Sequence, residues 1–415
     1  MITMRPMRIT LAIFTAFMLF SCTGKKQKAD QNTVRNDDPS VDASLEYIQK
    51  HLALKQEAAR IVSALDDRQL AAQVIITGID GRGQLPRHMK TLLEECPAGG
   101  IMLFRYNLDT DNSEIKSLIS ETAKLISAGA AVTEDTEKNL KIKIAPFICI
   151  DHEGGKVNRF RSGLADIPSA SSYWEMAQEK SREKAIACIY TDSFNAGRII
   201  NSLGVNFNFA PVAESLYTEN RSFLEDRSYG PDPAFTAKAA AAFIMGMDHS
   251  GLLCAVKHFP GSTGADPHLY PSVLYGDKNA LAELVNPFAD LIKDNHIQAL
   301  MVSHTSVPSR DSENIASLSP AIMGKWLRQE LGYNGIIICD DFSMAAAGSI
   351  GSDAAVVKSL AAGADMVLVW QADLRRTHRT VLAALNDGRL PRQRIQEAAG
   401  QIIYRKLNMG LLSGE

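Results

Sequence analysis

Short apolar runs alternate with longer segments of mixed character from about residue 46 to the end of the chain. Parallel strands that are buried on both faces have this pattern, because neither face of such a strand needs polar side chains. The runs predict strands at 73–78, 99–104, 144–150, 205–211, 252–259, 298–304, 335–340 and 364–369.

The segments between these runs have helical features. Residues 233–251 begin with a proline, are rich in alanine and end at a glycine, which together indicate a helix with defined ends. Ala321 to Leu331 follows Ser319-Pro320, which is a helix-start signal. Alternating strands and helices predict an α/β fold, a single (β/α)8 TIM-type barrel with room for one or two irregular strands. A doubly wound open sheet is the alternative.

The N-terminus has a different pattern. Arg5 and Arg8 precede the apolar run ITLAIFTAFMLF, which ends at Ser21-Cys22 and is short for a membrane span. This arrangement indicates an export signal, and the ending LFSC resembles a bacterial lipobox, in which the cysteine is lipidated. We therefore predict a lipoprotein-type signal over residues 1–22 with a lipid on Cys22. Plain secretion, with Cys22 as a bystander, is the alternative.

The next segment predicts a tether. Residues 23–45 are rich in Lys, Gln, Asp, Asn and Ser and contain few apolar residues, which is typical of a disordered linker. Residues 46–415 show no internal repeat and no change of composition, so we expect them to form one domain. The predicted location is exported and membrane-anchored, on the periplasmic or cell-surface side.

Composition limits the partners and cofactors. The chain has 415 residues, of which 46% are hydrophobic and 22% charged, with a formal net charge of −3. Without a basic stripe, nucleic acid is not expected as a partner. The cysteines other than Cys22 are scattered, and no CxxC or HExxH motif is present, so we expect buried structural cysteines, no metal and no cofactor. The oligomeric state stays open, with a monomer favoured.

Polar residues gather where the predicted strands end. In a barrel of this kind the active site lies at the carboxyl ends of the strands, in the loops that follow them. Such loops and strand ends carry DHEGGKVNR at 151–159, EDRSYG at 225–230, Lys257-His258, His304 and Asp340-Asp341. Carboxylates together with Lys, Arg and His suit hydrogen-bond recognition of a polyol and acid/base or nucleophilic chemistry on it.

One loop carries a candidate proton-transfer pair. The stretch VKHFPGSTGADPH at 256–268 follows an apolar strand and places Asp266 two residues before His268. A carboxylate beside an imidazole orients the ring and raises its basicity, which allows the ring to transfer a proton near neutral pH. A solvated loop with incidental histidines is the alternative.

These residues together resemble glycoside hydrolase family 3. The resemblance rests on successive blocks from about residue 70 to 410, and the Asp-x-His after KHFPG is similar to the bacterial β-N-acetylglucosaminidase branch. The blocks are DHEGGKVNRF, NFAPV, DRSYGPDP, KHFPG, IASLSP, CDDFSM and AAGADMVLV.

The resemblance implies the catalytic roles. Asp340 matches the family nucleophile, which forms a covalent glycosyl-enzyme intermediate and retains configuration. Asp341 is the rival for this role, but in an extended segment its side chain would point the other way and would suit a helix cap. His268 matches the acid/base of this branch, with Asp266 as its orienting partner. It would protonate the leaving oxygen and later activate water.

The resemblance also implies the sugar-binding residues. Asp151, Lys257, His258 and Arg227 match the family's substrate-binding positions. A carboxylate can accept from adjacent hydroxyls, while Lys and Arg can donate to them. Ion pairs that close the barrel mouth are the alternative for each of the four. Arg159 and His304 are candidates for the wall of the site or for structural roles.

The chain departs from the branch at several positions. It reads KHFPGST where KHFPGHG is usual, and the loop between Gly261 and Asp266 is about two residues shorter. Pro267 stands inside the dyad in place of Ser or Thr, and Cys339 stands before the nucleophile in place of Ser or Thr. These changes affect the expected fit of the substrate more than the expected chemistry.

The predicted function is that of a retaining exo-β-N-acetylglucosaminidase. Such an enzyme (also termed a β-N-acetylhexosaminidase) would remove terminal β-linked N-acetylglucosamine from cell-wall-derived glycosides. A β-glucosidase or β-xylosidase of the same family is one alternative, against which the Asp-x-His dyad counts. A non-catalytic sugar-binding lipoprotein is the other, and the intact candidates for nucleophile and acid/base count against it.

Overall fold

The computed structural model describes residues 39–130, 132–133, 141–161, 163–344 and 352–414, with only the backbone of 39–45 and 132–133. The predicted signal, most of the predicted tether and Cys22 therefore lie outside the described residues. Contacts group the chain into residues 1–50 and 51–415, and helix α1 (Pro39–Ala64) crosses this division.

Eight parallel strands form a closed barrel in 51–415, which confirms the predicted (β/α)8 fold. The strands follow one another around the barrel in chain order, and β12 closes it by pairing with β1. Each lies within one of the predicted apolar runs. They are β1 (Ile75–Gly78), β2 (Gly100–Met102), β5 (Phe147–Ile150), β6 (Phe207–Asn208), β7 (Leu253–Phe259), β8 (Ala299–Val302), β11 (Ile336–Cys339) and β12 (Met366–Val369).

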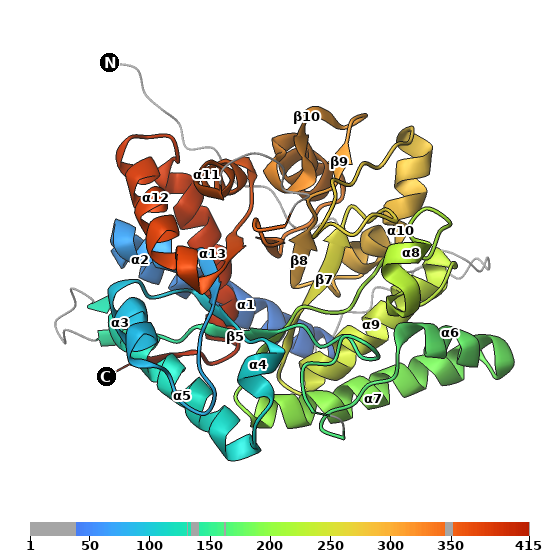
Figure 1. Cartoon of the computed structure of the whole chain (residues 1–415), viewed down its shortest axis with the longest axis horizontal. Helices are drawn as coiled ribbons and strands as arrows, with labels where there is room; N and C mark the ends of the chain where they lie inside the picture. The colour runs from blue at the N-terminus through green and yellow to red at the C-terminus, as the bar shows by residue number, and fades with distance from the viewer. Residues whose placement is uncertain (1–38, 131, 134–140, 162, 345–351, 415) are drawn as a thin grey trace, which may run out of the picture. The chain divides into compact units, whose positions relative to one another are not determined.

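Helices surround the strands, as Figure 1 shows for α5, α7 and α9. The remaining α-helices are α2 (Asp67–Gln73), α3 (Arg87–Glu95), α4 (Arg105–Leu108), α5 (Asn112–Gly129), α6 (Ala170–Glu179), α7 (Arg182–Ser202), α8 (Arg221–Leu224), α9 (Pro233–His249), α10 (Lys278–Lys293), α11 (Ser352–Ala362), α12 (Leu374–Asn386) and α13 (Arg392–Asn408). Short 3₁₀ turns lie at Glu225–Arg227, Ala316–Leu318 and Gln371–Asp373.

The two helices predicted from their end signals are present. Helix α9 begins after Asp232, whose side chain accepts hydrogen bonds from two backbone N–H groups of the first turn, and Pro233 occupies the first helical position. Gly251, just beyond its end, has a φ of 89°, a conformation that glycine adopts without strain. The second helix, Ala321–Glu330, is a π-helix, which the sequence did not distinguish from an α-helix.

Two small antiparallel sheets add to the barrel. Strand β4 (Lys141–Ile144) pairs with β3 (Val132–Thr133) and with β13 (Leu412–Gly414). A hairpin of β9 (Ser306–Val307) and β10 (Asp311–Ile315) follows β8 at the mouth of the barrel. Neither sheet was predicted, because these strands lack a continuous apolar run.

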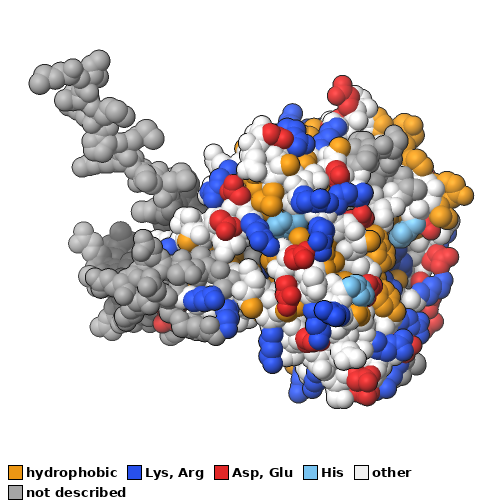
Figure 2. Space-filling view, turned by 60° about the vertical axis from the view of Figure 1, so that its left-hand side comes forward, with side chains coloured by type: hydrophobic (Ala, Val, Ile, Leu, Met, Phe, Trp, Pro, Cys, Tyr) orange, Lys and Arg blue, Asp and Glu red, His pale blue; other side chains and the backbone are white. Residues whose placement is uncertain are grey.

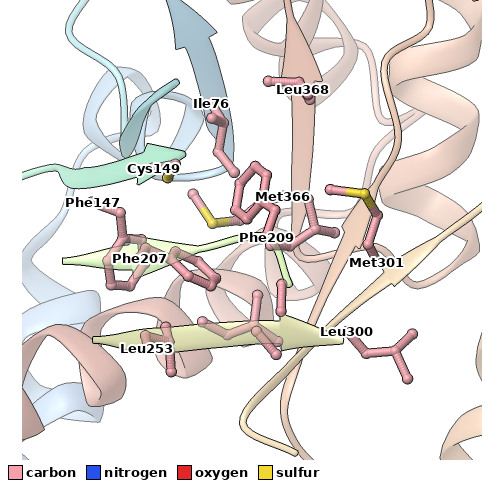
Figure 3. Close-up of a cluster of buried hydrophobic side chains, with 14 of the residues drawn as sticks. Ile76, Phe147, Cys149, Phe207, Phe209, Leu253, Leu300, Met301, Met366 and Leu368 are labelled. Atoms are coloured by element: carbon pink, nitrogen blue, oxygen red, sulfur yellow. The ribbon is translucent and has the colours of Figure 1, made fainter. Parts of the chain in front are cut away.

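The barrel interior is packed with apolar side chains from all around the sheet. Figure 3 shows Phe147 of β5, Phe207 and Phe209 at β6, and Met366 of β12 converging in the interior. These side chains are at most 1% exposed, so the interior is a core and not a channel. A ligand can therefore enter only at the ends of the barrel.

A buried lysine closes the end at which the strands begin. The Nζ of Lys406, on α13, donates to the side-chain oxygen of Gln73 over 2.8 Å and lies 5.1 Å from the ring centroid of Phe147. Burial lowers the pKa of Lys406 to about 7. With this end filled, a substrate site is expected only at the other end.

Charged residues are mixed over the surface of the protein. In Figure 2, Lys and Arg side chains lie beside Asp and Glu side chains across the face shown. No helix among the described residues is long and apolar enough to cross a membrane. The cysteines at 96, 149, 188, 254 and 339 form no disulfide in the described structure, and all but Cys188 are buried.

Candidate active site

A cavity of about 220 Å³ lies at the mouth of the barrel. It is smaller than the roughly 300–1,000 Å³ typical of drug-sized ligands, which suits a single sugar ring. Six residues proposed from the sequence line it together, and so do Arg159 and His304. The six are Asp151, Arg227, Lys257, His258, His268 and Asp340.

Lys257, near the end of β7, binds the loop after β5 at the cavity wall. Its ammonium, at the end of a side chain only 4% exposed, lies 2.7 Å from an oxygen of Asp151 and 2.7 Å from an oxygen of Glu153. Arg227 donates two parallel hydrogen bonds to Glu153, over 2.8 and 2.9 Å. Arg159 contacts the second oxygen of Asp151 over 3.2 Å. The ion pairs considered as an alternative for these residues are therefore present, and they lie on the cavity wall.

These groups are all charged at neutral pH. Burial alone would raise the pKa of Glu153, but Arg227 and Lys257 outweigh it and hold that pKa well below its usual value. Burial would lower the pKa of Lys257, but Asp151 and Glu153 raise it. The pKa of Asp151 is lowered in the same way, because Lys257 and Arg159 outweigh burial. The wall therefore offers both charged donors and a charged acceptor.

His258 has a carboxylate partner that sequence reasoning missed. Its Nδ1 lies 2.7 Å from an oxygen of Glu214, which also accepts from the His258 backbone N–H over 3.2 Å and from Ser262 over 3.1 Å. A carboxylate accepts, so Nδ1 carries the ring hydrogen and Nε2 is the free nitrogen. The other oxygen of buried Glu214 has no partner among the described residues.

Both missed carboxylates could have been found from the sequence. Glu153 and Glu214 each follow a predicted strand by a few residues, as the proposed site residues do. Their partners, however, lie 74 and 44 residues away along the chain, and the motif gave no reason to pair them.

The two neighbouring aspartates point in different directions. Asp340 follows β11 and lines the cavity, whereas Asp341 does not line it. The carboxylate of Asp341 instead accepts from the backbone N–H and the hydroxyl of Ser343, over 2.9 and 2.8 Å, and forms a turn. Burial raises its pKa. Of the two aspartates, only Asp340 therefore lines the cavity.

His304 fixes the backbone beside these aspartates. Its Nε2 donates to the carbonyl oxygen of Asp341 over 2.9 Å, and its Nδ1 accepts from Ser317 over 2.7 Å. The ring stacks on Phe342 with a centroid distance of 5.1 Å. Burial lowers the pKa of His304, so the ring is neutral at neutral pH. His304 therefore combines both roles considered for it: it lines the cavity and supports the turn.

The Asp266–His268 dyad forms on the rim of the cavity. Nδ1 of His268 lies 2.8 Å from an Asp266 oxygen, which also accepts from the His268 backbone N–H over 2.9 Å. These hydrogen bonds outweigh partial burial and lower the pKa of Asp266. The His268 side chain is 68% exposed, and His268, but not Asp266, lines the cavity. Pro267 between them does not prevent the pairing.

No metal site accompanies these residues in the described part of the chain, where no group of three or more His, Cys, Asp or Glu side chains could hold an ion. The cavity brings together the carboxylate of Asp340, the imidazole of His268 and a wall of charged hydrogen-bonding groups. Such a set can act on a polyhydroxylated ligand by nucleophilic and acid/base catalysis.

Known proteins share this sequence and architecture. The model of the glycosyl hydrolase family 3 N-terminal domain matches residues 67–404, which include every barrel strand. A beta-hexosaminidase of Methylococcus capsulatus is 33% identical over 279 residues, 66% of this chain and 75% of that protein.

Solved structures agree with this match. A family 3 beta-N-acetylglucosaminidase from Paenibacillus sp. str. FPU-7 has 26% identity and a TM-score of 0.75, covering 84% of this chain and 63% of that chain. The present chain thus spans less than two thirds of the Paenibacillus protein. M. tuberculosis LpqI has 27% identity and a TM-score of 0.69, covering 83% of this chain and 95% of that chain.

The buried charge network leads to a stability prediction. Glu153→Gln removes the charge that two buried cations share, and we expect a loss of about 3–5 kcal/mol in the free energy of unfolding, measured by urea titration. Folding lowers the pKa of Glu153, so its stabilisation is present above the ordinary glutamate pKa of 4.5 and is lost as the pH falls further. The difference in the free energy of unfolding between the wild-type protein and Glu153→Gln should therefore become smaller at acidic pH.

Glu225→Gln is the matched control. Glu225 pairs with Lys156 on the surface, where both side chains are more than half exposed, so we expect an unchanged unfolding midpoint. Equal midpoints for Glu153→Gln and the wild-type protein at neutral pH would contradict the importance of the network.

Proposed function

The chain belongs to glycoside hydrolase family 3, and we propose that it is an exo-acting β-N-acetylglucosaminidase that removes terminal β-linked N-acetylglucosamine. The observation that carries this proposal is the Asp266–His268 dyad on the same cavity as Asp340. The proposal is also supported by a relative, because the similar M. capsulatus protein is named beta-hexosaminidase. Glycosides derived from the bacterial cell wall are the proposed natural substrates.

In the proposed mechanism Asp340 is the nucleophile. Its carboxylate attacks the anomeric carbon, and the bond from this carbon to the leaving oxygen breaks with its electron pair on that oxygen. His268 delivers a proton to the same oxygen through Nε2, while Asp266 holds Nδ1. Water, deprotonated by His268, then displaces Asp340 from the covalent intermediate, so that two inversions give net retention.

The charged wall would hold the sugar during both steps. Asp151 is 20% exposed and can accept from hydroxyls on the cavity side, where Lys257 and Arg227 can donate. The free Nε2 of His258 can accept from one more hydroxyl, because Glu214 fixes the ring. This wall is assembled before substrate arrives, which lowers the cost of ordering the site on binding.

The two aspartates provide the first test. Asp340→Asn removes the attacking charge, and we expect turnover of nitrophenyl β-N-acetylglucosaminide to fall by about four orders of magnitude or more. Asp341→Asn keeps the cavity intact and should retain turnover within about tenfold. Loss in Asp341→Asn with full activity in Asp340→Asn would assign the nucleophile to Asp341. If the wild-type protein hydrolysed nitrophenyl β-glucoside but not nitrophenyl β-N-acetylglucosaminide, the proposed function would be wrong.

The dyad provides the second test. His268→Ala should lower kcat/KM by about 10²–10⁴-fold for methyl β-N-acetylglucosaminide, whose leaving oxygen must be protonated. The loss should be much smaller for the nitrophenyl glycoside, because nitrophenolate leaves without a proton. His249→Ala, at an exposed histidine bonded to Tyr190, serves as the control and should behave as wild type. Equal losses on both glycosides would argue against proton transfer by His268.

We also propose that the chain is exported and anchored by a lipid on Cys22, which follows a basic start and a short apolar run. In bacteria fed a palmitate analogue, the wild-type chain should take up the label and sediment with membranes. Cys22→Ala should lose both properties, whereas Cys188→Ala should keep them. A labelled Cys22→Ala chain, or an unlabelled wild-type chain, would count against the anchor.

A further inference from the structure

A stack of aromatic rings lies at the mouth of the barrel, on the loops after β2 and β12. The ring of Phe104 lies between two others, 4.9 Å from Trp370 with planes at 7°, and 5.8 Å from Tyr106 with planes at 13°. Tyr106 is 41% exposed, and Phe104 and Trp370 are partly exposed. We call Phe104, Tyr106 and Trp370 the aromatic platform.

A polar side chain with a free acceptor lies beside the platform. Nε2 of Gln371 donates to Asp80 over 2.8 Å, which fixes the orientation of the amide because a carboxylate only accepts. The other end of the amide, Oε1, is buried and has no partner among the described residues. It lies over Gly78, where an added Cβ would be 2.8 Å from this oxygen and 3.1 Å from Phe104. Because this oxygen is buried, Gln371 supports the platform from the inside and offers no contact to a ligand.

The platform adjoins the cavity that holds Asp340. Leu368 lines the cavity, and Trp370 follows it by two residues, which favours the same side of the strand. Nε1 of Trp370 also donates to the hydroxyl of Ser343 over 2.9 Å. Met344, which follows Ser343 in the chain, lines the cavity, so Trp370 is bonded to the segment that forms the cavity wall.

The proposed function fixes the direction of a bound glycan. The hydroxyl-binding groups come from the loops after β5 and β6 and from the end of β7 itself, whereas Asp340 follows β11. In the closed order of eight strands, β6 lies opposite β12. A sugar held by its hydroxyls at Asp151 and Lys257, with its anomeric carbon at Asp340, therefore directs the leaving group toward β12 and β1.

We propose that the aromatic platform binds the sugar on the leaving side of the scissile bond. The inference rests on the proposed function, because that function sets the direction of the glycan. The C–H face of a pyranose packs on the exposed surface of Tyr106 and Trp370. The ligand is a hexopyranose, as found both in chitin fragments and in the N-acetylmuramic acid of cell-wall fragments.

A second surface with tyrosines lies on the other side of the cavity. Tyr217 and Tyr275 line a groove of about 280 Å³ that shares only Ser262 with the cavity. This groove lies behind the loop of the dyad, next to the end of the sugar that carries the bound hydroxyls. Tyr275 is 83% exposed and is outside the proposed site, so its substitution is a matched control.

The test compares two kinds of substrate on the full chain. The measured quantity is kcat/KM for a disaccharide divided by kcat/KM for methyl β-N-acetylglucosaminide, which lacks a leaving sugar. The disaccharides are N,N′-diacetylchitobiose and its analogue with N-acetylmuramic acid in the leaving position. We expect Trp370→Ala to lower this ratio about tenfold for at least one disaccharide, which identifies the source of the leaving sugar.

Two controls separate binding from support of the fold. Trp370→Phe keeps a stacking ring but loses the hydrogen bond to Ser343, and its ratio should stay within about threefold of wild type. Tyr275→Ala should leave the ratio unchanged. The proposal would be wrong if Trp370→Ala left the kcat/KM ratio unchanged for both disaccharides, or if Tyr275→Ala lowered this ratio instead.

The platform can also be tested if the proposed hydrolase activity is absent. If the wild-type chain does not hydrolyse methyl β-N-acetylglucosaminide, calorimetric titration with N,N′-diacetylchitobiose replaces the kinetics. At least tenfold weaker binding by Trp370→Ala than by the wild-type chain would still support the platform. Equal binding by the two proteins would overturn it.

Discussion

The ammonium of Lys257 between the carboxylates of Asp151 and Glu153 is the interaction on which the rest of the site depends. It joins the loop after β5 to the end of β7, and Arg227 extends the network to a third loop through Glu153. Each of these ions would be costly to bury alone, so each one makes the others possible. The floor of the cavity is therefore a preassembled unit of charges and not a set of independent side chains.

Two histidine–carboxylate pairs border the same cavity in different environments. The His258–Glu214 pair is buried, with three donors on one oxygen, so its ring is fixed. The His268–Asp266 pair is on the rim, where 68% of the His268 side chain is exposed. A fixed ring such as that of His258 suits recognition of a hydroxyl. A ring that transfers protons, as proposed for His268, must be accessible to the leaving group and to water. The environments thus agree with the different roles proposed for the two histidines.

The features that could be predicted from the sequence were those encoded over short distances. The barrel strands appear as continuous apolar runs, and the dyad appears as two residues separated by one proline. The partners of the buried carboxylates could not be predicted, since Glu153 and Arg227 meet only after the barrel closes. Strand β6 is shorter than its apolar run partly because a side-chain oxygen of Asn206 takes the backbone N–H of Ile148. No residue pattern signals such a replacement.

The different chemistry of the two sides of the mouth has a consequence for specificity. On the β5–β7 side, charged groups contact the proposed terminal sugar, and the packed core below them leaves no exit. A glycan would then enter by its end, which is what the proposed exo action requires. On the β12–β2 side the platform presents ring surface, which packs on the C–H face of a pyranose whatever charge that sugar carries. Selection would therefore be strict for the sugar that is removed and tolerant for the sugar that leaves.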